Sequence, residues 1–177
     1  QGAKLAVSAD GSETPERVQI NKAMIGFLIG TGFAHGGNGF EGIEFLIDCF
    51  KDAKLADPGD EKHGLDLKAI AATYVKKFKA EKARRKAVGE EASSIPGINH
   101  PVFKGQSVNH DPREVFLASV FKKRGEFNVF HAFYRVLVQE LFDSGVTKNV
   151  FCVNIDAVIA ALLLKLVWPR YRDGSLQ

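Results

Sequence analysis

Apolar residues recur at helical spacing along most of this chain. The clearest case is residues 40–56, where one set of apolar side chains lies three and four positions apart: Phe40, Ile43, Leu46, Ile47 and Phe50. Positions with that spacing share one face of an α-helix, so the pattern predicts an amphipathic helix here. The same reasoning predicts five further helices, over residues 16–34, 65–91, 113–125 and 127–145 and from Asn154 onward.

Glycine and proline mark where these helices end. Gly125 and Gly145 are expected to terminate the two helices that precede them. Between residues 92 and 113, a continuous helix is excluded by three prolines: Pro96, Pro101 and Pro112. The one candidate strand is NVFCVNI, residues 149–155. We therefore predict an all-α, multi-helical fold with little or no β-structure.

The length of 177 residues suits one domain with a sizeable core. Residues 1–16 are small and polar and are expected to form an arm or loop. Residues 17–168 carry the helical patterns and form the predicted domain, and residues 169–177 form a polar tail. Because the chain begins with Gln and its tail directly follows an apolar segment, we expect a piece of a longer protein that continues beyond this tail.

Composition narrows the class of protein. The net charge of +3 is too small to indicate a nucleic-acid partner. The longest apolar run, residues 157–168, is interrupted by Lys165 and is too short to span a bilayer. Cys49 and Cys152 both lie in apolar runs, and two thiols in a chain of this length fit a reducing compartment better than a disulfide scaffold. We expect a cytoplasmic protein with no membrane or nucleic-acid partner.

The glycine-rich segment HGGNG, residues 35–39, has three interpretations. A histidine followed by glycines can bring the backbone close to a substrate while the imidazole faces a cleft. The same letters occur in the oxyanion segment of lipases, but a hydrolase also needs Gly-x-Ser-x-Gly, and the nearest match, GQSVN at residues 105–109, lacks the last glycine. The third interpretation is a turn between helices.

Three other features have a structural and a functional interpretation. The basic run at residues 76–86 is a solvated helix face or binds the phosphates of an anionic cofactor. His131 lies among aromatic residues and is expected to be packed in the core. Asp156 begins an apolar helix, where a carboxylate is a cap or dipole partner or a base for a carbon-bound proton. The histidines and cysteines have no metal-ligand spacing, so we expect no metal site.

Three segments, in this order, resemble the citrate synthase superfamily. AHGGNGFEGIEFL at residues 34–46 is similar to its first histidine motif, and PGINHPVFKGQSVNHDPR at residues 96–113 is similar to its signature of Gly, His, a basic residue and Asp-Pro-Arg. NVFCVNIDAVIAALL at residues 149–163 is similar to its Asn-x-Asp segment before an apolar helix. The resemblance covers residues 20–168 and implies the small, active-site-bearing domain of that family.

The resemblance implies three catalytic residues. His35 would hydrogen-bond the acetyl thioester carbonyl and stabilise its enol. Asp156 would remove the methyl proton of acetyl-CoA, and His100 would polarise the ketone of oxaloacetate and protonate the new alkoxide. A base on one side of a thioester and a hydrogen-bond donor at the developing oxyanion are what removal of a weakly acidic proton requires.

Binding residues are also implied by the resemblance. Arg113 would clamp a substrate carboxylate, with Asn38 and Asn154 as further substrate-binding residues. Lys104 and Gly97 would bind coenzyme A, which enters as a substrate, with no metal. The implied reaction, of the kind found in tricarboxylic acid metabolism, makes or breaks a carbon–carbon bond between acetyl-CoA and a 2-oxo dicarboxylate such as oxaloacetate. The parent protein would be a homodimer or a larger homo-oligomer.

The sequence departs from the family pattern in two places. Ile98 and Asn99 stand before His100, where the family has a small aromatic or aliphatic residue and then Gly or Ala. Lys104 and Asp111 are separated by a longer segment than the common pattern has, as in the citryl-CoA-cleaving module of ATP-citrate lyases. Synthesis and cleavage therefore both stay open. The alternative is a truncated, inactive fragment that keeps the fold and binds CoA without turnover.

Overall fold

The computed structural model describes residues 21, 24–25, 38–91 and 94–176. The chain divides into two compact units, Gln1–Asn38 and Gly39–Gln177, and nearly all of the described residues belong to the second. The predicted N-terminal arm and nearly all of the helix predicted over residues 16–34 lie outside the described residues. The described part contains the following helices: α3 (Asn38–Phe50), α4 (Leu67–Ala87), α5 (Pro112–Arg124), α6 (Val129–Asp143) and α7 (Ile155–Arg172).

The all-α prediction is confirmed within the described ranges. The strand candidate at residues 149–155 forms no sheet there. Its residues contribute only to two isolated bridges, an antiparallel one between Ile98 and Val153 and a parallel one between Val108 and Val150. The backbone around residue 150 pairs with the segment of residues 92–113, which contains three prolines. It does not pair with a second strand in the described ranges.

Local sequence signals set most helix ends. Asp66, Asp111, Asn128 and Asn154 each accept a hydrogen bond from a backbone N–H in the first turn of the helix that follows. Gly125 ends α5 in the left-handed conformation at φ 65°, as predicted. The four short polar side chains thus satisfy N–H groups that have no partner within the helix.

The last helix runs further than the sequence indicated. α7 continues through Pro169 to Arg172, so the first residues of the predicted tail are helical. Trp168 is fully buried and donates its indole N–H to the carbonyl of Leu55 at 3.0 Å. The guanidinium of Arg172 lies 5.9 Å from the Trp168 ring, and these contacts stabilise the final turn despite the proline.

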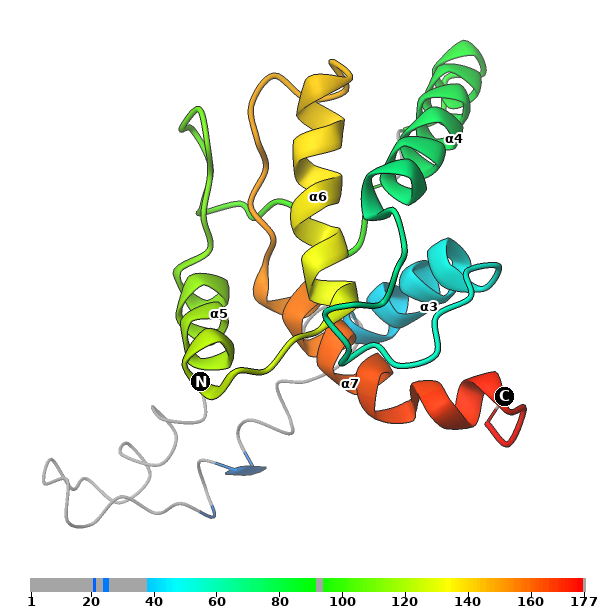
Figure 1. The fold of residues 1–177 in the computed structure, drawn as a ribbon. Coiled ribbons are helices and arrows are strands. Elements are labelled where there is room, and N and C mark those ends of the chain that lie inside the picture. Colours follow the sequence, from blue (N-terminus) through cyan, green and yellow to red (C-terminus); the bar gives the residue numbers. More distant parts are fainter. Residues whose placement is uncertain (1–20, 22–23, 26–37, 92–93, 177) are drawn as a thin grey trace, which may run out of the picture. The chain divides into compact units, whose positions relative to one another are not determined.

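The core lies around α6, which stands between α5 and α4 in Figure 1 and also packs on α7. Its buried aromatic residues include Phe130, Phe133 and Tyr134. The Phe50 ring of α3 meets the Phe130 and Phe133 rings edge-on at 5.2 and 5.0 Å. Each such side chain contributes about 1.5–3 kcal/mol by burial, so this cluster is the main source of stability for the unit.

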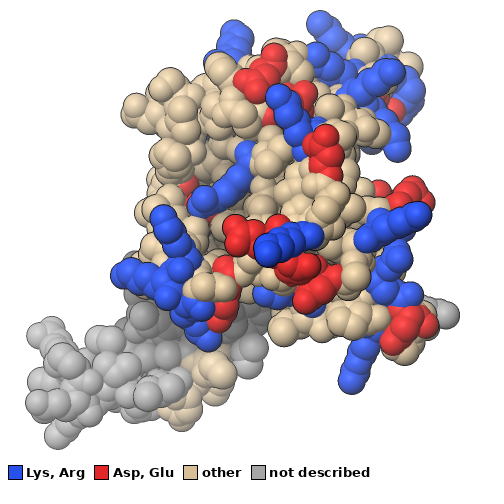
Figure 2. All heavy atoms as spheres, viewed as in Figure 1, with Lys and Arg blue, Asp and Glu red and all other residues tan. Residues whose placement is uncertain are grey.

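On the face shown in Figure 2, lysines and arginines gather at the lower left, where α5 lies, and form a second group over the end of α4. That group includes Arg84, Arg85 and Lys86 in the last turn of the helix. Arg84 and Arg85 both bond to Glu81, which offsets part of their charge. No helix in the described part of the chain is long and apolar enough to cross a membrane.

Candidate functional site

The start of α7 is held by Asn154. The Asn154 side-chain oxygen accepts hydrogen bonds from the backbone N–H groups of Asp156 at 2.9 Å and Ala157 at 3.2 Å. Its amide nitrogen donates to the carbonyl of Asn99 at 3.1 Å. One buried amide therefore fixes the first turn of α7 and also holds the residue that precedes His100. Asp156 itself is half-buried in that turn.

Backbone pairing lays residues 97–109 along the segment that leads into α7. The N–H of Asn99 donates to the carbonyl of Cys152 at 2.8 Å, and the N–H of Asn154 donates to the carbonyl of Gly97 at 2.9 Å. Gly97 has a φ of 80°, and a Cβ at this position would lie 2.7 Å from the Ala157 Cβ. Only glycine allows this approach, which brings the segment of His100 against the first turn of α7.

A buried carboxylate joins α5 to α7. The Asp111 side chain is 0% exposed and accepts from the Arg113 guanidinium at 2.9 and 2.7 Å. It also accepts from the backbone N–H of Ile155 at 3.2 Å, one residue before Asp156. Burial opposes ionisation of Asp111, but the hydrogen bonds from Arg113 outweigh it, so the pKa of Asp111 is lowered.

The carboxylates of Asp111 and Asp156 both act electrostatically on Arg113. Its hydrogen bonds to Asp111 raise the pKa of Arg113, and the nearby Asp156 carboxylate adds to that increase. The Arg113 side chain is 48% exposed, so one edge of the guanidinium faces solvent. The predicted base and the predicted carboxylate clamp therefore lie within electrostatic reach of one another.

The Phe103 ring connects His100 with Arg113. The rings of His100 and Phe103 stack with centroids 4.6 Å apart, and the Arg113 guanidinium lies 5.6 Å from the same Phe103 ring. His100 Nδ1 accepts the backbone N–H of Val102 at 3.2 Å. In a neutral imidazole with Nδ1 as acceptor, Nε2 carries the proton and is the hydrogen-bond donor.

Five of the predicted residues thus lie around the start of α7: Gly97, His100, Arg113, Asn154 and Asp156. Lys104 is exposed on the loop between Phe103 and the Val108 bridge. His35 lies outside the described residues, and Asn38 is described only as the first residue of α3. Ser107, which the hydrolase interpretation required, lies on an exposed loop and not on a strand–turn–helix elbow.

Two hollows lie beside the basic run of α4. One of about 240 Å³ lies behind Ile98 and Asn99, and it is lined largely by apolar side chains together with Lys82 and Thr147. The Thr147 hydroxyl is buried and has no hydrogen-bond partner among the described residues. The second is lined in part by Lys79, Lys82 and Lys86. An apolar slot with an unpaired hydroxyl and lysines at its edge suits a ligand with a flat apolar part and a phosphate part.

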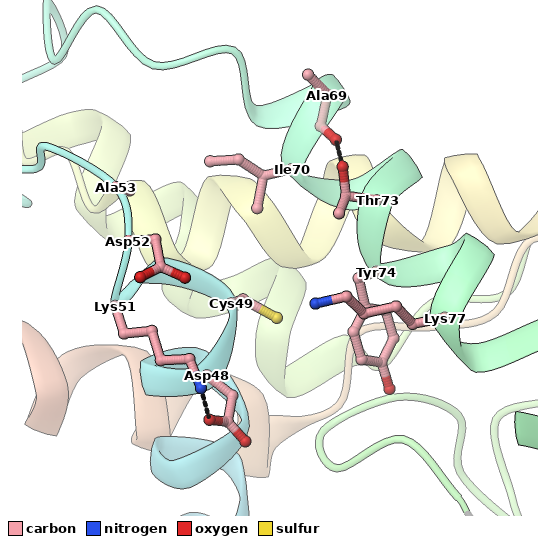
Figure 3. Close-up of a pocket in the computed structure, with 10 residues that line it drawn as sticks. All are labelled: Asp48, Cys49, Lys51, Asp52, Ala53, Ala69, Ile70, Thr73, Tyr74 and Lys77. Carbon is pink, nitrogen blue, oxygen red and sulfur yellow. Dashed lines mark hydrogen bonds and ion pairs between the residues drawn. The ribbon is translucent and has the colours of Figure 1, made fainter.

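A further hollow lies between the end of α3 and the start of α4 and measures about 560 Å³ (Figure 3). Cys49 and Lys77 point toward one another across it, while Lys51 is held by Asp48 at 3.0 Å. Burial, with a smaller contribution from Asp48, raises the pKa of the Cys49 thiol to about 12. The thiol is therefore protonated at neutral pH and is a poor nucleophile.

A second buried carboxylate was not indicated by the sequence. Glu114 Oε1 accepts from His131 Nε2 and from Arg135 Nη2, both at 2.7 Å. Burial opposes ionisation, but these hydrogen bonds outweigh it and lower the pKa of Glu114. His131 is buried, as predicted, and it also pairs with a charge. Glu114 and Arg135 are too far apart in the chain for a local pattern to connect them.

Comparison with known proteins assigns the chain to no family. No protein-family model, no curated protein and no solved structure matches it. In the described ranges, no group of three or more His, Cys, Asp or Glu side chains is placed to hold a metal ion. The function is therefore inferred from the residues around the start of α7 and from the three sequence segments with a family resemblance.

Proposed function

We propose that this chain is a catalytic domain of citrate synthase or citryl-CoA lyase type. Such a domain makes or breaks a carbon–carbon bond between acetyl-CoA and a 2-oxo acid. The observation that carries the proposal is the connected set of contacts from His100 through Phe103 to Arg113, and from Arg113 through Asp111 to the residue before Asp156. His100 and Arg113 are thus linked through the Phe103 ring, and Arg113 is linked through Asp111 to Ile155, the neighbour of Asp156, although these residues lie in two distant parts of the chain.

In the proposed reaction, Asp156 takes a methyl proton from acetyl-CoA, the enolate carbon that results attacks the ketone carbon of oxaloacetate, and the thioester C=O forms again as the new carbon–carbon bond is made. The proton on His100 Nε2 passes to the alkoxide that forms, which gives citryl-CoA. Cleavage is the reverse sequence, with His100 as the base and Asp156 as the acid. Each group contributes about 10²–10⁴-fold in rate. The resemblance adds His35 as the residue that stabilises the enol oxygen.

Arg113 retains donors for a substrate carboxylate. Asp111 occupies its Nε and one N–H of Nη2. Among the described residues nothing binds Nη1 or the second N–H of Nη2, and one N–H of each of these nitrogens forms the outer edge of the guanidinium. A carboxylate of a 2-oxo dicarboxylate fits that edge with two parallel charge-assisted hydrogen bonds.

We propose that the coenzyme binds in the slot that Asn99 helps to line. The slot that contains Thr147 would take an apolar part of CoA, with the unpaired hydroxyl as its hydrogen-bond partner. Lys82 and Lys86 at the adjoining hollow would bind phosphates, and exposed Lys104 would add a third positive charge. The free thiols of Cys49 and Cys152 support a cytoplasmic setting, and a homodimeric or larger parent protein is part of the proposal.

Proton exchange tests the proposal directly. The full chain is incubated with acetyl-CoA and oxaloacetate in heavy water, and loss of the methyl proton signal is followed by NMR. Asp156→Asn should lower the exchange rate at least about 10²-fold, because the amide cannot take the proton. Asp143→Asn, at an exposed carboxylate at the end of α6, is the matched control and should exchange at the wild-type rate.

The same experiment separates the alternatives. Exchange that is equal in wild type and Asp156→Asn excludes Asp156 as the base. CoA binding without exchange in the wild-type chain favours the fragment that binds without turnover. A chain that neither binds CoA nor exchanges protons contradicts the proposal as a whole.

A further inference from the structure

Phe103 is an aromatic residue outside the hydrophobic core. From residue 101 to residue 108 it is the only side chain that is not exposed. It belongs neither to the buried core cluster nor to the partly buried residues packed against that cluster. The contacts recorded for its ring are with His100 and Arg113. Core packing therefore does not explain why an aromatic ring is held at this position.

His100 depends on this ring for its orientation. Apart from the stacking contact, the imidazole has one hydrogen bond, the 3.2 Å contact from the backbone N–H of Val102. A hydrogen bond of that length is near the upper limit for N–H donors, so it restrains the imidazole only weakly. The neighbours Pro101 and Val102 are both exposed, whereas Phe103 is half-buried.

Arg113 is also held from two sides. Asp111 fixes the Nε edge of its guanidinium, and the Phe103 ring covers the guanidinium at 5.6 Å. A cation over an aromatic ring keeps its in-plane donors free for a carboxylate, whereas a second acidic partner would occupy them. The ring thus restrains Arg113 without competing with a substrate anion.

We propose that Phe103 is a positioning residue that sets His100 and Arg113 in register for one substrate, a 2-oxo acid whose carboxylate binds Arg113 while its ketone binds His100 Nε2. This inference rests on the function proposed above. It adds a residue to which the family resemblance assigned no role, since Phe103 is none of the catalytic or binding residues that the resemblance implies. Without the ring, Arg113 would no longer be positioned for the carboxylate of the 2-oxo acid, and His100 would no longer be positioned for its ketone. CoA binding would be unchanged.

The test compares Phe103→Leu, which keeps an apolar side chain without the ring, with Phe103→Tyr, which keeps the ring. Phe116→Leu, at a 66% exposed phenylalanine on α5, is the matched control. The measurements are the Kd for oxaloacetate, the Kd for acetyl-CoA and the rate of methyl proton exchange. Phe103→Leu should weaken oxaloacetate binding and slow exchange about tenfold each, with acetyl-CoA affinity unchanged. Phe103→Tyr and Phe116→Leu should stay within about twofold of wild type.

The contact itself has an independent readout. The ring protons of His100 should be shifted upfield in the NMR spectra of wild type and Phe103→Tyr, and should lose that shift in Phe103→Leu. Wild-type binding and exchange with no change in Phe103→Leu overturn the positioning role alone, as does a defect that Phe103→Tyr shares. A wild-type chain that neither binds oxaloacetate nor exchanges protons overturns the proposed function, and the positioning role with it.

Discussion

Asp111 shows how one side chain links elements that are far apart in the sequence. It caps α5 through the N–H of Arg113, binds the Arg113 guanidinium and reaches the N–H of Ile155 at the start of α7. The preference of aspartate for helix N-caps, here followed by Pro112 in the first turn, is visible in the sequence. The contact with Ile155 has no local signal, because it depends on how the two helices pack.

The two thiols provide a prediction at the residue scale. Because burial raises the pKa of Cys49 to about 12, its thiolate fraction at pH 8 is about 1 in 10⁴. Burial also raises the pKa of Cys152. We expect iodoacetamide to alkylate the folded chain far more slowly than free cysteine, with the rate still rising above pH 10. Cys49→Ser and Cys152→Ser variants assign the rates to single thiols. Alkylation of Cys49 at the rate of free cysteine would contradict this.

At the scale of elements, the helices follow from local pattern, whereas the irregular segment between α4 and α5 does not. Three prolines showed that residues 92–113 were not one helix, but they could not show where the segment would lie. Its position is fixed by backbone hydrogen bonds to residues 150–154. Asn99 has a φ of 70°, a conformation that asparagine tolerates better than most residues. The path of this segment decides whether His100 approaches α7.

Gly97 tests that path. Gly97→Ala combines a left-handed φ of 80° with a Cβ placed 2.7 Å from the Ala157 Cβ. Gly105→Ala is the matched control, since Gly105 has a φ of 99° and nothing within 4 Å of the added Cβ. Both variants should lose about 1–2 kcal/mol to the left-handed backbone, and Gly97→Ala should lose about 1–3 kcal/mol more to overpacking. Urea unfolding measures both, and equal losses would show that the contact with α7 is not tight.

At the scale of the whole unit, aromatic packing around α6 is joined by buried charge pairs. Glu114 connects α5 to α6, and Asp111 connects α5 to α7. α5 is amphipathic only weakly and buries little apolar surface of its own, with Glu114 as its buried residue. The attachment of α5 to the rest of the unit therefore depends on the carboxylates of Asp111 and Glu114, which must be ionised to make these contacts.

This dependence predicts acid sensitivity. The pKa values of Asp111 and Glu114 are lowered in the folded chain, so the unfolded chain binds protons more readily as the pH falls. The ordinary pKa of a carboxyl group is about 4, and above that pH these groups contribute their full stability. The contribution is lost as the pH falls through the lowered pKa values of the folded chain. Urea unfolding from pH 7 to pH 3 should show this loss.

Variants identify the groups responsible. Glu114→Gln should be less stable than wild type at pH 7 and should lose less on acidification, and Asp111→Asn should behave in the same way. Asp143→Asn is the exposed control and should follow the wild-type curve. A Glu114→Gln curve parallel to that of wild type would show that this carboxylate does not govern the acid response.

The sequence by itself determined the helical class and most helix ends, because helical periodicity, capping side chains and glycine termini act between residues a few positions apart. It also pointed, through a resemblance, to Gly97, His100, Arg113, Asn154 and Asp156. Only the tertiary structure decided that these residues lie around the start of one helix. It also showed that the Asn154 side chain hydrogen-bonds backbone groups, and that Phe103 and Asp111 connect the other residues. Such contacts join distant segments, and they exist only once packing of the aromatic core has brought α5, α6 and α7 together.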